Sequence, residues 1–276
     1  MKPLVKTIRN ENNDFQRIEV VKRNREKRNR YREFFVEGVK PINFAIENNW
    51  EIRSFVYSGE APLSDWAKGV LRNSTAKTHF ELPLRLMDKL SDKDEELSEL
   101  IAIVSIPGDD IARIRVGDDT LLVVIDRPSG YGNLGTIIRS CEALKVDGIV
   151  VTGHAVDIYD SRTIRASMGT LFAVPIIRLQ SHRQLLPWFN DIRKIHRDFK
   201  IVGSSAGGDA LIMDADLATR PMALIIGNET LGLSYNYKQL CDVLVRIPMH
   251  GHITSLNIAC AASIMLYELE RQRNFN

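Results

Sequence analysis

Short apolar runs alternate with amphipathic stretches over the first hundred residues, a pattern that predicts a compact α/β domain. Strands are predicted at residues 34–38, 52–57 and 100–105. Helices are predicted at residues 41–49, 61–71 and 84–90. Pro41 suits the start of the first of these helices, because a backbone N–H has no partner there in any case. The acidic residues 91–96 are interpreted as a loop, and the turn-forming residues from 107 to 119 predict a domain boundary.

From residue 118 onward, apolar runs alternate with helical stretches, which is typical of an α/β domain with a parallel sheet. Strands are predicted at residues 121–125, 149–152, 171–175, 200–203, 224–226 and 243–247. Helices are predicted up to residue 145 and from residue 182 to 197. Several of these strands end in loops of small residues, such as Gly203-Ser-Ser-Ala-Gly-Gly208 and Gly227-Asn-Glu229. Because the carboxyl ends of parallel strands share one edge of a sheet, a ligand site is predicted at that edge.

The last loop, at residues 247–257, leads into a helix of unusually small residues. Thr254 or Ser255 is predicted to cap this helix, with Asn257 in its first turn. The start of a helix presents N–H groups that lack partners within the helix, so a ligand can bind there. Residues 259–263 have little side-chain bulk, which predicts close packing against another segment or another chain.

Composition agrees with two globular domains, since the chain has 276 residues, 44% of them hydrophobic and 26% charged. No apolar run reaches the roughly 18 residues of a membrane span, and the N-terminus lacks the apolar core of a signal peptide. We therefore expect a cytoplasmic protein with no membrane partner. The cysteines Cys141, Cys241 and Cys260 have no CxxC spacing, which argues against a disulfide framework or a thiolate zinc site and predicts burial.

Positive charge is concentrated near the N-terminus, although the net charge is only +2. Residues 1–40 carry 12 Lys/Arg against 6 Asp/Glu, and seven of these cations fall in residues 22–32, a predicted basic helix. Such a run is either a solvated helix face or a phosphate-binding surface, on which Tyr31 could stack on an unpaired base. The candidate nucleic-acid-binding residues are Lys22, Arg23, Arg25, Arg28, Arg30 and Arg32, with a second basic cluster at Arg162 and Arg165.

A glycine-rich loop connects the strand at residues 121–125 to the following helix. Its Gly130-x-Gly132-x-x-Gly135 spacing is that of a dinucleotide-binding fingerprint, so an NAD-dependent oxidoreductase is one alternative. An NAD site needs an acidic residue at the end of the next strand to hold the ribose hydroxyls. That strand ends near Thr152, and Asp157 comes late, which weighs against the alternative.

Two further features suggest chemistry without deciding it. Arg139 follows Ile137 and Ile138 in an otherwise apolar helix, and its partner is either Glu142 one turn later or the phosphate of a ligand. The pair His250-x-His252 suggests a metal enzyme, but no third ligand lies in register. We therefore predict no metal site.

Three motifs in order resemble those of the SpoU (SPOUT-class, TrmH-like) RNA 2′-O-ribose methyltransferases. They are Asn133-x-Gly135-x-x-x-Arg139, then Gly227-Asn-Glu229-x-x-Gly-Leu233, then Ile247-Pro-Met249 followed by Ser255-Leu-Asn257. The resemblance covers residues 118–273. The N-terminal part, with Phe35-Val-Glu-Gly38 after the basic helix, resembles the ribosomal-protein-like RNA-binding domain often attached to this enzyme.

The resemblance implies an RNA-binding α/β domain at residues 1–110 and a methyltransferase domain at 118–276, whose parallel sheet contains a deep trefoil knot. It implies a homodimer that methylates a ribose 2′-OH in structured RNA, with ribosomal RNA favoured over transfer RNA. The implied S-adenosylmethionine pocket consists of Ser204, Ser205, Gly227, Ile247, Met249 and Leu256. The implied catalytic and substrate-positioning residues are Asn133, Arg139, Glu229, Ser255 and Asn257.

The chemistry of the implied reaction suits these residue types. S-adenosylmethionine carries an activated methyl group, so the protein has mainly to align the ribose hydroxyl and to stabilise developing negative charge. Arg139 is a poor general base, because a guanidinium stays protonated in proteins, and we expect it to hold a nucleotide phosphate instead. An RNA-binding protein without catalytic activity remains an alternative, against which the intact polar residues of all three motifs weigh.

Overall fold

The computed structural model describes residues 3–91 and 98–274, and the chain divides into two compact units. The first unit comprises Met1–Pro107 together with Asp157–Ala173, and the second comprises Gly108–Val156 and Val174–Asn276. The segment at 157–173 therefore belongs with the N-terminal unit, whereas the sequence suggested two contiguous domains. Most of the acidic stretch expected to form a loop, residues 92–97, lies outside the described residues.

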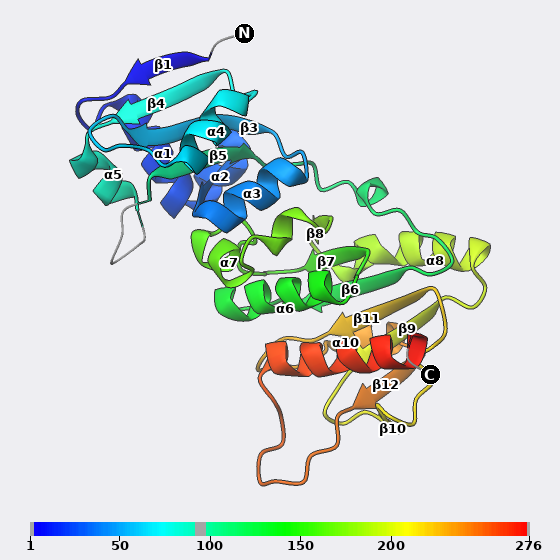
Figure 1. Cartoon of the computed structure of the whole chain (residues 1–276). Helices are drawn as coiled ribbons and strands as arrows, with labels where there is room; N and C mark the ends of the chain where they lie inside the picture. Colours follow the sequence, from blue (N-terminus) through cyan, green and yellow to red (C-terminus); the bar gives the residue numbers. More distant parts are fainter. Residues whose placement is uncertain (1–2, 92–97, 275–276) are drawn as a thin grey trace. The chain divides into compact units, whose positions relative to one another are not determined.

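The first unit contains a five-stranded sheet in the order β1-β4-β3-β5-β2, in which β5 runs antiparallel to both of its neighbours. Its strands are β1 (Leu4–Thr7), β2 (Glu33–Glu37), β3 (Ile52–Ser58), β4 (Thr78–Leu82) and β5 (Leu100–Ser105). Its first five helices are α1 (Asn13–Arg23), α2 (Arg25–Tyr31), α3 (Val39–Glu47), α4 (Asp65–Asn73) and α5 (Leu84–Leu90). Figure 1 shows these elements in blue, cyan and blue-green. The predicted strands and helices of this half are all present, and β1, α1 and β4 are additional.

The basic stretch forms two helices, because Asn24 interrupts it. Asn24 has extended backbone angles, and its side chain accepts a hydrogen bond from the Lys27 N–H, which caps α2. Helix α1 buries Phe15, Ile18 and Val21 at a helical spacing in the core of the unit. The cations near the junction of α1 and α2 consequently point in different directions.

The segment Asp157–Ala173 packs on the first unit through an aromatic cluster. Phe34 stacks with Phe172 at a centroid distance of 5.9 Å and contacts Tyr159 at 4.7 Å. The Trp50 Nε1–H donates a hydrogen bond of 2.9 Å to the Phe172 carbonyl. The segment forms helix α7 (Ser161–Ala166) and a 3₁₀ turn at Thr170–Phe172, so the strand predicted at residues 171–175 is wrong. Its apolar side chains fill this aromatic cluster instead of a sheet.

The second unit contains a seven-stranded, wholly parallel sheet in the order β10-β12-β9-β11-β6-β7-β8. Its strands are β6 (Leu121–Asp126), β7 (Gly148–Thr152), β8 (Ile176–Leu179), β9 (Lys200–Ser204), β10 (Ala210–Leu211), β11 (Met222–Ile226) and β12 (Val243–Arg246). Its helices are α6 (Tyr131–Ala143), α8 (Leu185–Ile195), α9 (Tyr235–Leu240) and α10 (Ile258–Asn274). The expected fold class, an α/β domain with a parallel sheet, is confirmed.

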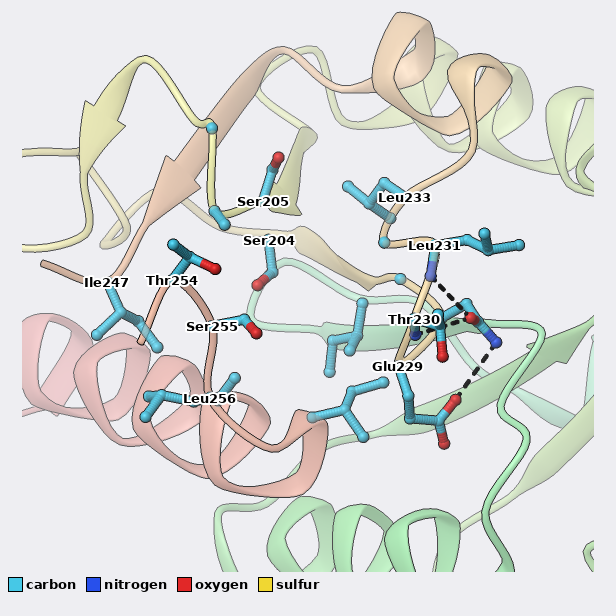
Figure 2. Close-up of a pocket in the computed structure, with 18 of the residues that line it drawn as sticks. Ser204, Ser205, Glu229, Thr230, Leu231, Leu233, Ile247, Thr254, Ser255 and Leu256 are labelled. Carbon is cyan, nitrogen blue, oxygen red and sulfur yellow. Dashed lines mark hydrogen bonds between the residues drawn. The ribbon is translucent and has the colours of Figure 1, made fainter. Parts of the chain in front are cut away.

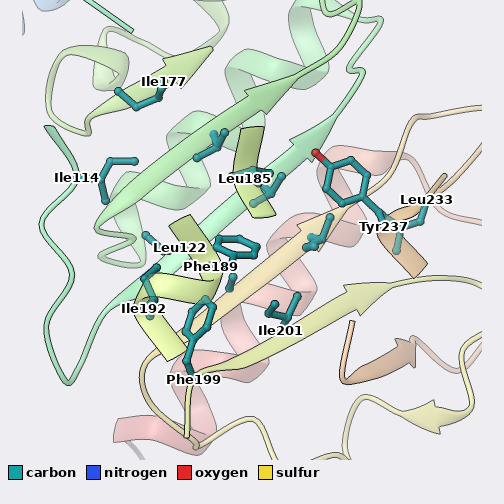
Figure 3. Packing of buried hydrophobic residues seen from close by; sticks show 14 residues of the cluster. Ile114, Leu122, Ile177, Leu185, Phe189, Ile192, Phe199, Ile201, Leu233 and Tyr237 are labelled. Atoms are coloured by element: carbon teal, nitrogen blue, oxygen red, sulfur yellow. The ribbon is translucent and has the colours of Figure 1, made fainter. Parts of the chain in front are cut away.

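Helices cover both faces of this sheet. On one face, Leu185, Phe189 and Ile192 of α8 and Tyr237 of α9 pack on alternate residues of the central strands, as Figure 3 shows. On the other face, α6 and α10 lie side by side (Figure 1), and the hydroxyls of Ser140 and Ser263 are 2.8 Å apart between them. Burial on both faces explains the continuous apolar runs of β6 and β11.

The strand order determines where a site can form. Strands β12, β9, β11 and β6 are consecutive neighbours in the sheet, and all four run in the same direction. The loops that follow them therefore meet at one edge, as the sequence predicted. The trefoil knot in this region stays a prediction.

Candidate active site at the carboxyl edge of the second sheet

A cavity of about 360 Å³ opens where the loops after β9, β11 and β12 meet the start of α10. Figure 2 shows Ser204 and Ser205, Glu229, Ile247 and Leu256 around it. All six residues expected to hold S-adenosylmethionine line this cavity: Ser204, Ser205, Gly227, Ile247, Met249 and Leu256. Glu229 and Ser255, from the expected catalytic set, line it too. The cavity thus gathers residues that lie about fifty positions apart in the sequence.

The wall formed by the loop after β11 requires glycine at position 227. A Cβ atom there would lie 2.3 Å from the backbone of both Gly232 and Leu233. Two backbone hydrogen bonds between Asn228 and Gly232, of 3.0 and 2.9 Å, close the loop over this contact. The glycine therefore allows the loop to fold back tightly against the end of its own strand.

The Glu229 carboxylate joins the loop after β11 to the loop after β6. It accepts hydrogen bonds from the Ser129 N–H at 3.0 Å, the Ser129 hydroxyl at 2.8 Å and the Gly130 N–H at 3.0 Å. Asn133 Nδ2 adds a longer bond of 3.4 Å. Since Gly130 precedes the first turn of α6, the carboxylate satisfies N–H groups at the positive end of that helix.

Electrostatics keep this carboxylate ionised. Partial burial alone raises the pKa of Glu229, but hydrogen bonds from its own N–H and from Ser129 and Gly130 lower it more, and the net direction is downward. Ser129 carries no motif that would single it out in the sequence, so its contact with Glu229 is visible only in the structure.

Asn257 links the third motif to the first. Its Nδ2 donates a hydrogen bond of 3.0 Å to Asn133 Oδ1, and its own Oδ1 accepts a bond of 2.8 Å from the Ala259 N–H. Asn257 is therefore the cap of α10, and the expectation that Thr254 or Ser255 caps this helix is wrong. Thr254 and Ser255 belong to an exposed loop and line the cavity instead.

The same contacts exclude the dinucleotide alternative. A nucleotide-binding glycine loop offers its N–H groups to a pyrophosphate. Here the N–H groups of Ser129 and Gly130 are occupied by Glu229, which is itself an anion. Gly132 and Gly135 lie within α6. The GxGxxG spacing is thus a coincidence of the loop sequence.

Arg139 is exposed on α6, although its neighbours in the sequence are apolar. Leu134, Ile137, Ile138 and Cys141 form the buried face of the helix, and the helical rotation places Arg139 outside that face. Within the described residues, Arg139 has no ion pair or hydrogen bond, including with Glu142. Its guanidinium is accordingly available to a ligand.

The structure divides the eight candidate nucleic-acid-binding residues. Lys22 and Arg28 are buried, at 7% and 1% exposure, and their assignment to a nucleic-acid surface is wrong. Lys22 donates to the Leu90 carbonyl and lies over the Phe35 ring. Arg32 is half-buried and donates to the carbonyls of Ile106 and Pro107. The exposed members are Arg23, Arg25, Arg30, Arg162 and Arg165.

The remaining candidates have simpler outcomes. His250 and His252 are exposed, and the described residues contain no group of three His, Cys, Asp or Glu side chains that could hold a metal. Cys141 is buried as expected, whereas Cys260 is exposed on α10.

Comparisons with known proteins agree with this fold. The model of the SpoU rRNA Methylase family matches residues 120–267, and that of the SpoU L30e-like domain matches residues 12–102. The chain is 42% identical over 271 residues to the 23S rRNA (uridine(2479)-2′-O)-methyltransferase of Streptomyces viridochromogenes, covering 98% of this chain and 94% of that protein.

Two solved structures resemble the whole chain. One is the SpoU methyltransferase AviRb from Streptomyces viridochromogenes, crystallised with AdoMet, which has a TM-score of 0.89 at 42% identity. The match covers 95% of this chain and 98% of that chain. An AdoMet-bound rRNA methyltransferase from Sinorhizobium meliloti has a TM-score of 0.85 at 27% identity, covering 97% of this chain and 98% of that one. The chain belongs to the SpoU rRNA methylase family, and it is an RNA methyltransferase.

Proposed function

We propose that the protein transfers the methyl group of S-adenosylmethionine to the ribose 2′-OH of a uridine in 23S rRNA. The observation that carries this proposal is the 42% identity to a 23S rRNA uridine 2′-O-methyltransferase over 98% of the chain. The similarity includes the N-terminal unit as well as the catalytic sheet, and the N-terminal unit is the part that we expect to select the RNA. Ribosomal RNA is therefore favoured over transfer RNA as the substrate.

The cavity at the carboxyl edge suits S-adenosylmethionine in size and in chemistry. A volume of about 360 Å³ lies within the range of small-molecule sites. Ile247 and Leu256 offer apolar surface to an adenine ring, and the hydroxyls of Ser204 and Ser205 can bond polar groups of a nucleoside. When bound, the cofactor supplies an activated methyl group.

We assign the reaction to residues of the three motifs. Arg139, exposed on α6, grips a phosphate of the target nucleotide and offsets negative charge at the 2′-oxygen, which takes the methyl group from the sulfonium sulfur and releases its proton to water. Ser255 contacts the substrate from the exposed loop. Glu229, Asn133 and Asn257 hold the three motif loops in register through their shared hydrogen bonds.

The two parts of the sequence have separate tasks in this proposal. Residues 1–110 bind the RNA, through exposed arginines that include Arg23, Arg25 and Arg30, and residues 118–276 carry out methyl transfer. Each arginine near a phosphate releases counterions and strengthens binding. RNA with unpaired bases is a better target than a plain duplex, since its riboses can be presented singly to the site.

We further propose that the enzyme is a homodimer in the cytoplasm, where ribosomal RNA is made. Cys260, Ile264 and Tyr267 form an exposed stripe at helical spacing along α10, and Ile264 and Tyr267 are 41% and 60% exposed. In the described part of the chain, no helix is both long and apolar enough to cross a membrane. Sedimentation of the wild-type protein and of Ile264→Glu tests the dimer: a charge in the stripe should yield monomers, and equal masses would refute this interface.

The activity is tested with labelled S-adenosylmethionine and with 23S rRNA and transfer RNA that lack 2′-O-methyl groups. We expect label in 23S rRNA, and mapping of alkali-resistant bonds should locate a single 2′-O-methyluridine. Methylation of transfer RNA alone, or of a base, would overturn the proposed substrate. RNA binding without any transfer of label would support the alternative of a catalytically inactive RNA-binding protein.

A further inference from the structure

We propose that Arg25 of α2 together with Arg162 and Arg165 of α7 forms one surface for RNA phosphates, held in place by a buried brace of Arg28, Asp157 and Asp160. This inference rests on the proposed RNA substrate and extends it. It gives the segment at 157–173 a role in substrate binding, although the methyltransferase family model, at residues 120–267, includes that segment in the catalytic domain.

At the centre of the brace is Arg28, a buried arginine that donates several hydrogen bonds. Arg28 Nε donates to Asp157 Oδ2 at 2.8 Å, and its terminal nitrogens donate to Asp160 Oδ2 at 3.2 Å and to the Lys22 carbonyl at 2.7 Å. The side chain of Arg28 is 2% exposed, and those of Asp157 and Asp160 are 3% and 9% exposed. A charge this deep is retained only where its partners are fixed. The segment is therefore attached to α2 at a defined position.

Further contacts hold the same segment against the first unit. The Phe172 carbonyl accepts the Trp50 indole hydrogen bond, and Phe172 packs on Phe34. Gly169 has a φ of +89° and lies so close to α3 that a Cβ atom would be 2.7 Å from Pro41 Cα. The position of α7 on this unit is thus determined from the brace at one end and from these contacts at the other.

Asp160 connects the buried brace to the exposed surface. The same carboxylate that binds Arg28 accepts a hydrogen bond of 2.8 Å from Arg162 Nε and another from the Arg162 N–H, which caps α7. Burial raises the pKa of Asp160, but the hydrogen bonds and charge of Arg162 and the charge of Arg28 lower it overall. The carboxylate stays ionised, and the guanidinium of Arg162, 61% exposed, is held in one orientation.

Helical spacing determines where Arg25 and Arg165 lie relative to the brace and to Arg162. Arg25 precedes Arg28 by three residues in α2, so it lies on the side of α2 that faces α7. Arg165 follows Arg162 by three residues in α7 and is likewise exposed. Arg30 lies on the opposite side of α2. The three arginines thus lie on α2 and α7, the two helices that the brace joins, and their planar guanidiniums suit phosphate oxygens.

The surface is tested by the binding of a 23S rRNA fragment that lacks 2′-O-methyl groups, measured over a range of salt concentrations. Arg162→Gln and Arg165→Gln should each weaken binding and lower the slope of log affinity against log salt by about 0.7 to 0.9. Arg72→Gln, which removes an exposed arginine from α4 of the same unit, is the matched control and should leave the slope unchanged. Affinity for S-adenosylmethionine should be unchanged in all variants.

A double-mutant cycle tests the brace as a positioning element. Asp157→Asn keeps the shape of the side chain but removes its charge, and we expect RNA binding to weaken about threefold or more. In the Arg162→Gln/Arg165→Gln background the same substitution should have almost no further effect, because the guanidiniums that the brace orients are already absent. Arg28→Lys enters the same cycle if Asp157→Asn does not fold.

The outcomes separate this inference from the proposed function. If the wild-type enzyme methylates 23S rRNA but Arg162→Gln and Arg165→Gln resemble Arg72→Gln, the surface is refuted. If Asp157→Asn is equally harmful in both backgrounds, the brace serves only the fold, and its positioning role is refuted. If the RNA binds with the expected arginine dependence but receives no methyl group, the proposed activity fails while the surface stands.

Discussion

Asn257 holds Asn133 through a side-chain hydrogen bond of 3.0 Å while its own carbonyl oxygen caps α10. One amide group thus serves two elements that are 124 residues apart in the sequence. Since Asn133 also contacts Glu229, the three motifs of the family meet in a single chain of hydrogen bonds. Each link of this chain can be removed separately.

Two substitutions of Asn257 should separate its capping of α10 from its hydrogen bond to Asn133. Asn257→Ala loses both, and we expect the free energy of unfolding to fall by about 1 kcal/mol. Asn257→Asp keeps the capping oxygen but not the donor to Asn133, so stability should persist while methyl transfer slows. Urea unfolding and single-turnover methylation measure the two effects. Equal loss of stability in both variants would contradict the assignment of the cap.

The two glycines Gly227 and Gly207 both line the cavity at the carboxyl edge of the second sheet, but only Gly227 is sterically required. Gly227→Ala places a methyl group 2.3 Å from the backbone of Gly232 and Leu233, so the loop must move and S-adenosylmethionine should bind at least about tenfold more weakly. Gly207→Ala meets no atom within 4 Å and is the matched control. Calorimetry gives both affinities, and similar values for the two variants would show that the loop tolerates displacement.

Arg139 should be needed for chemistry and not for folding or cofactor binding. Because its side chain is exposed, Arg139→Ala should change the free energy of unfolding by less than about 0.5 kcal/mol. Affinity for S-adenosylmethionine should stay near the wild-type value while methyl transfer to RNA is abolished. Arg139→Lys should recover only part of the rate, since an ammonium lacks the planar fork. Retained activity in the alanine variant would remove Arg139 from the site.

His79 should make the first unit sensitive to acid. The side chain is 3% exposed, and neither ring nitrogen makes a hydrogen bond of ordinary geometry within the described residues. Burial lowers the pKa of His79 from its usual 6.5, and the Thr78 backbone offsets this only in part. Below pH 6.5 the unfolded chain takes up a proton that the folded chain refuses, so stability falls as the pH falls toward the folded-state pKa.

His79→Leu removes the titratable imidazole and replaces it with an apolar side chain of similar size. Urea unfolding between about pH 5 and pH 7.5 should show a wild-type stability that declines toward acid more steeply than that of the variant. Parallel pH profiles for the two proteins would assign the decline to other groups.

The catalytic sheet was predictable because burial on both faces leaves long apolar runs, and β6, β7, β9 and β11 lie within a residue or two of their predicted positions. The residues expected to hold the cofactor were named from the resemblance to the family, and all of them line one cavity. By contrast, β1 is short and exposed along its whole length, β4 is short and only partly buried, and their sequences carry no strong period.

What the sequence could not supply were contacts between distant residues. The charge run at residues 22–32 predicted one basic surface, but Lys22 and Arg28 turn inward because Leu90, Asp157 and Asp160 provide buried partners for them. The apolar run at 171–175 predicted a strand, but Phe172 joins an aromatic cluster instead. Its other members are Tyr159 and, more than a hundred residues earlier, Phe34 and Trp50. Local pattern cannot distinguish these outcomes.

Because Asp157–Ala173 completes the N-terminal unit, that unit cannot finish folding when its first 107 residues leave the ribosome. Until residue 173 has been synthesised, Arg28 is a cation without its two carboxylates, and Phe34 and Trp50 lack the rings that cover them. A fragment ending at residue 110 should therefore be unstable and prone to aggregation when produced alone. The order of synthesis thus delays folding of the first unit until part of the second unit has been made.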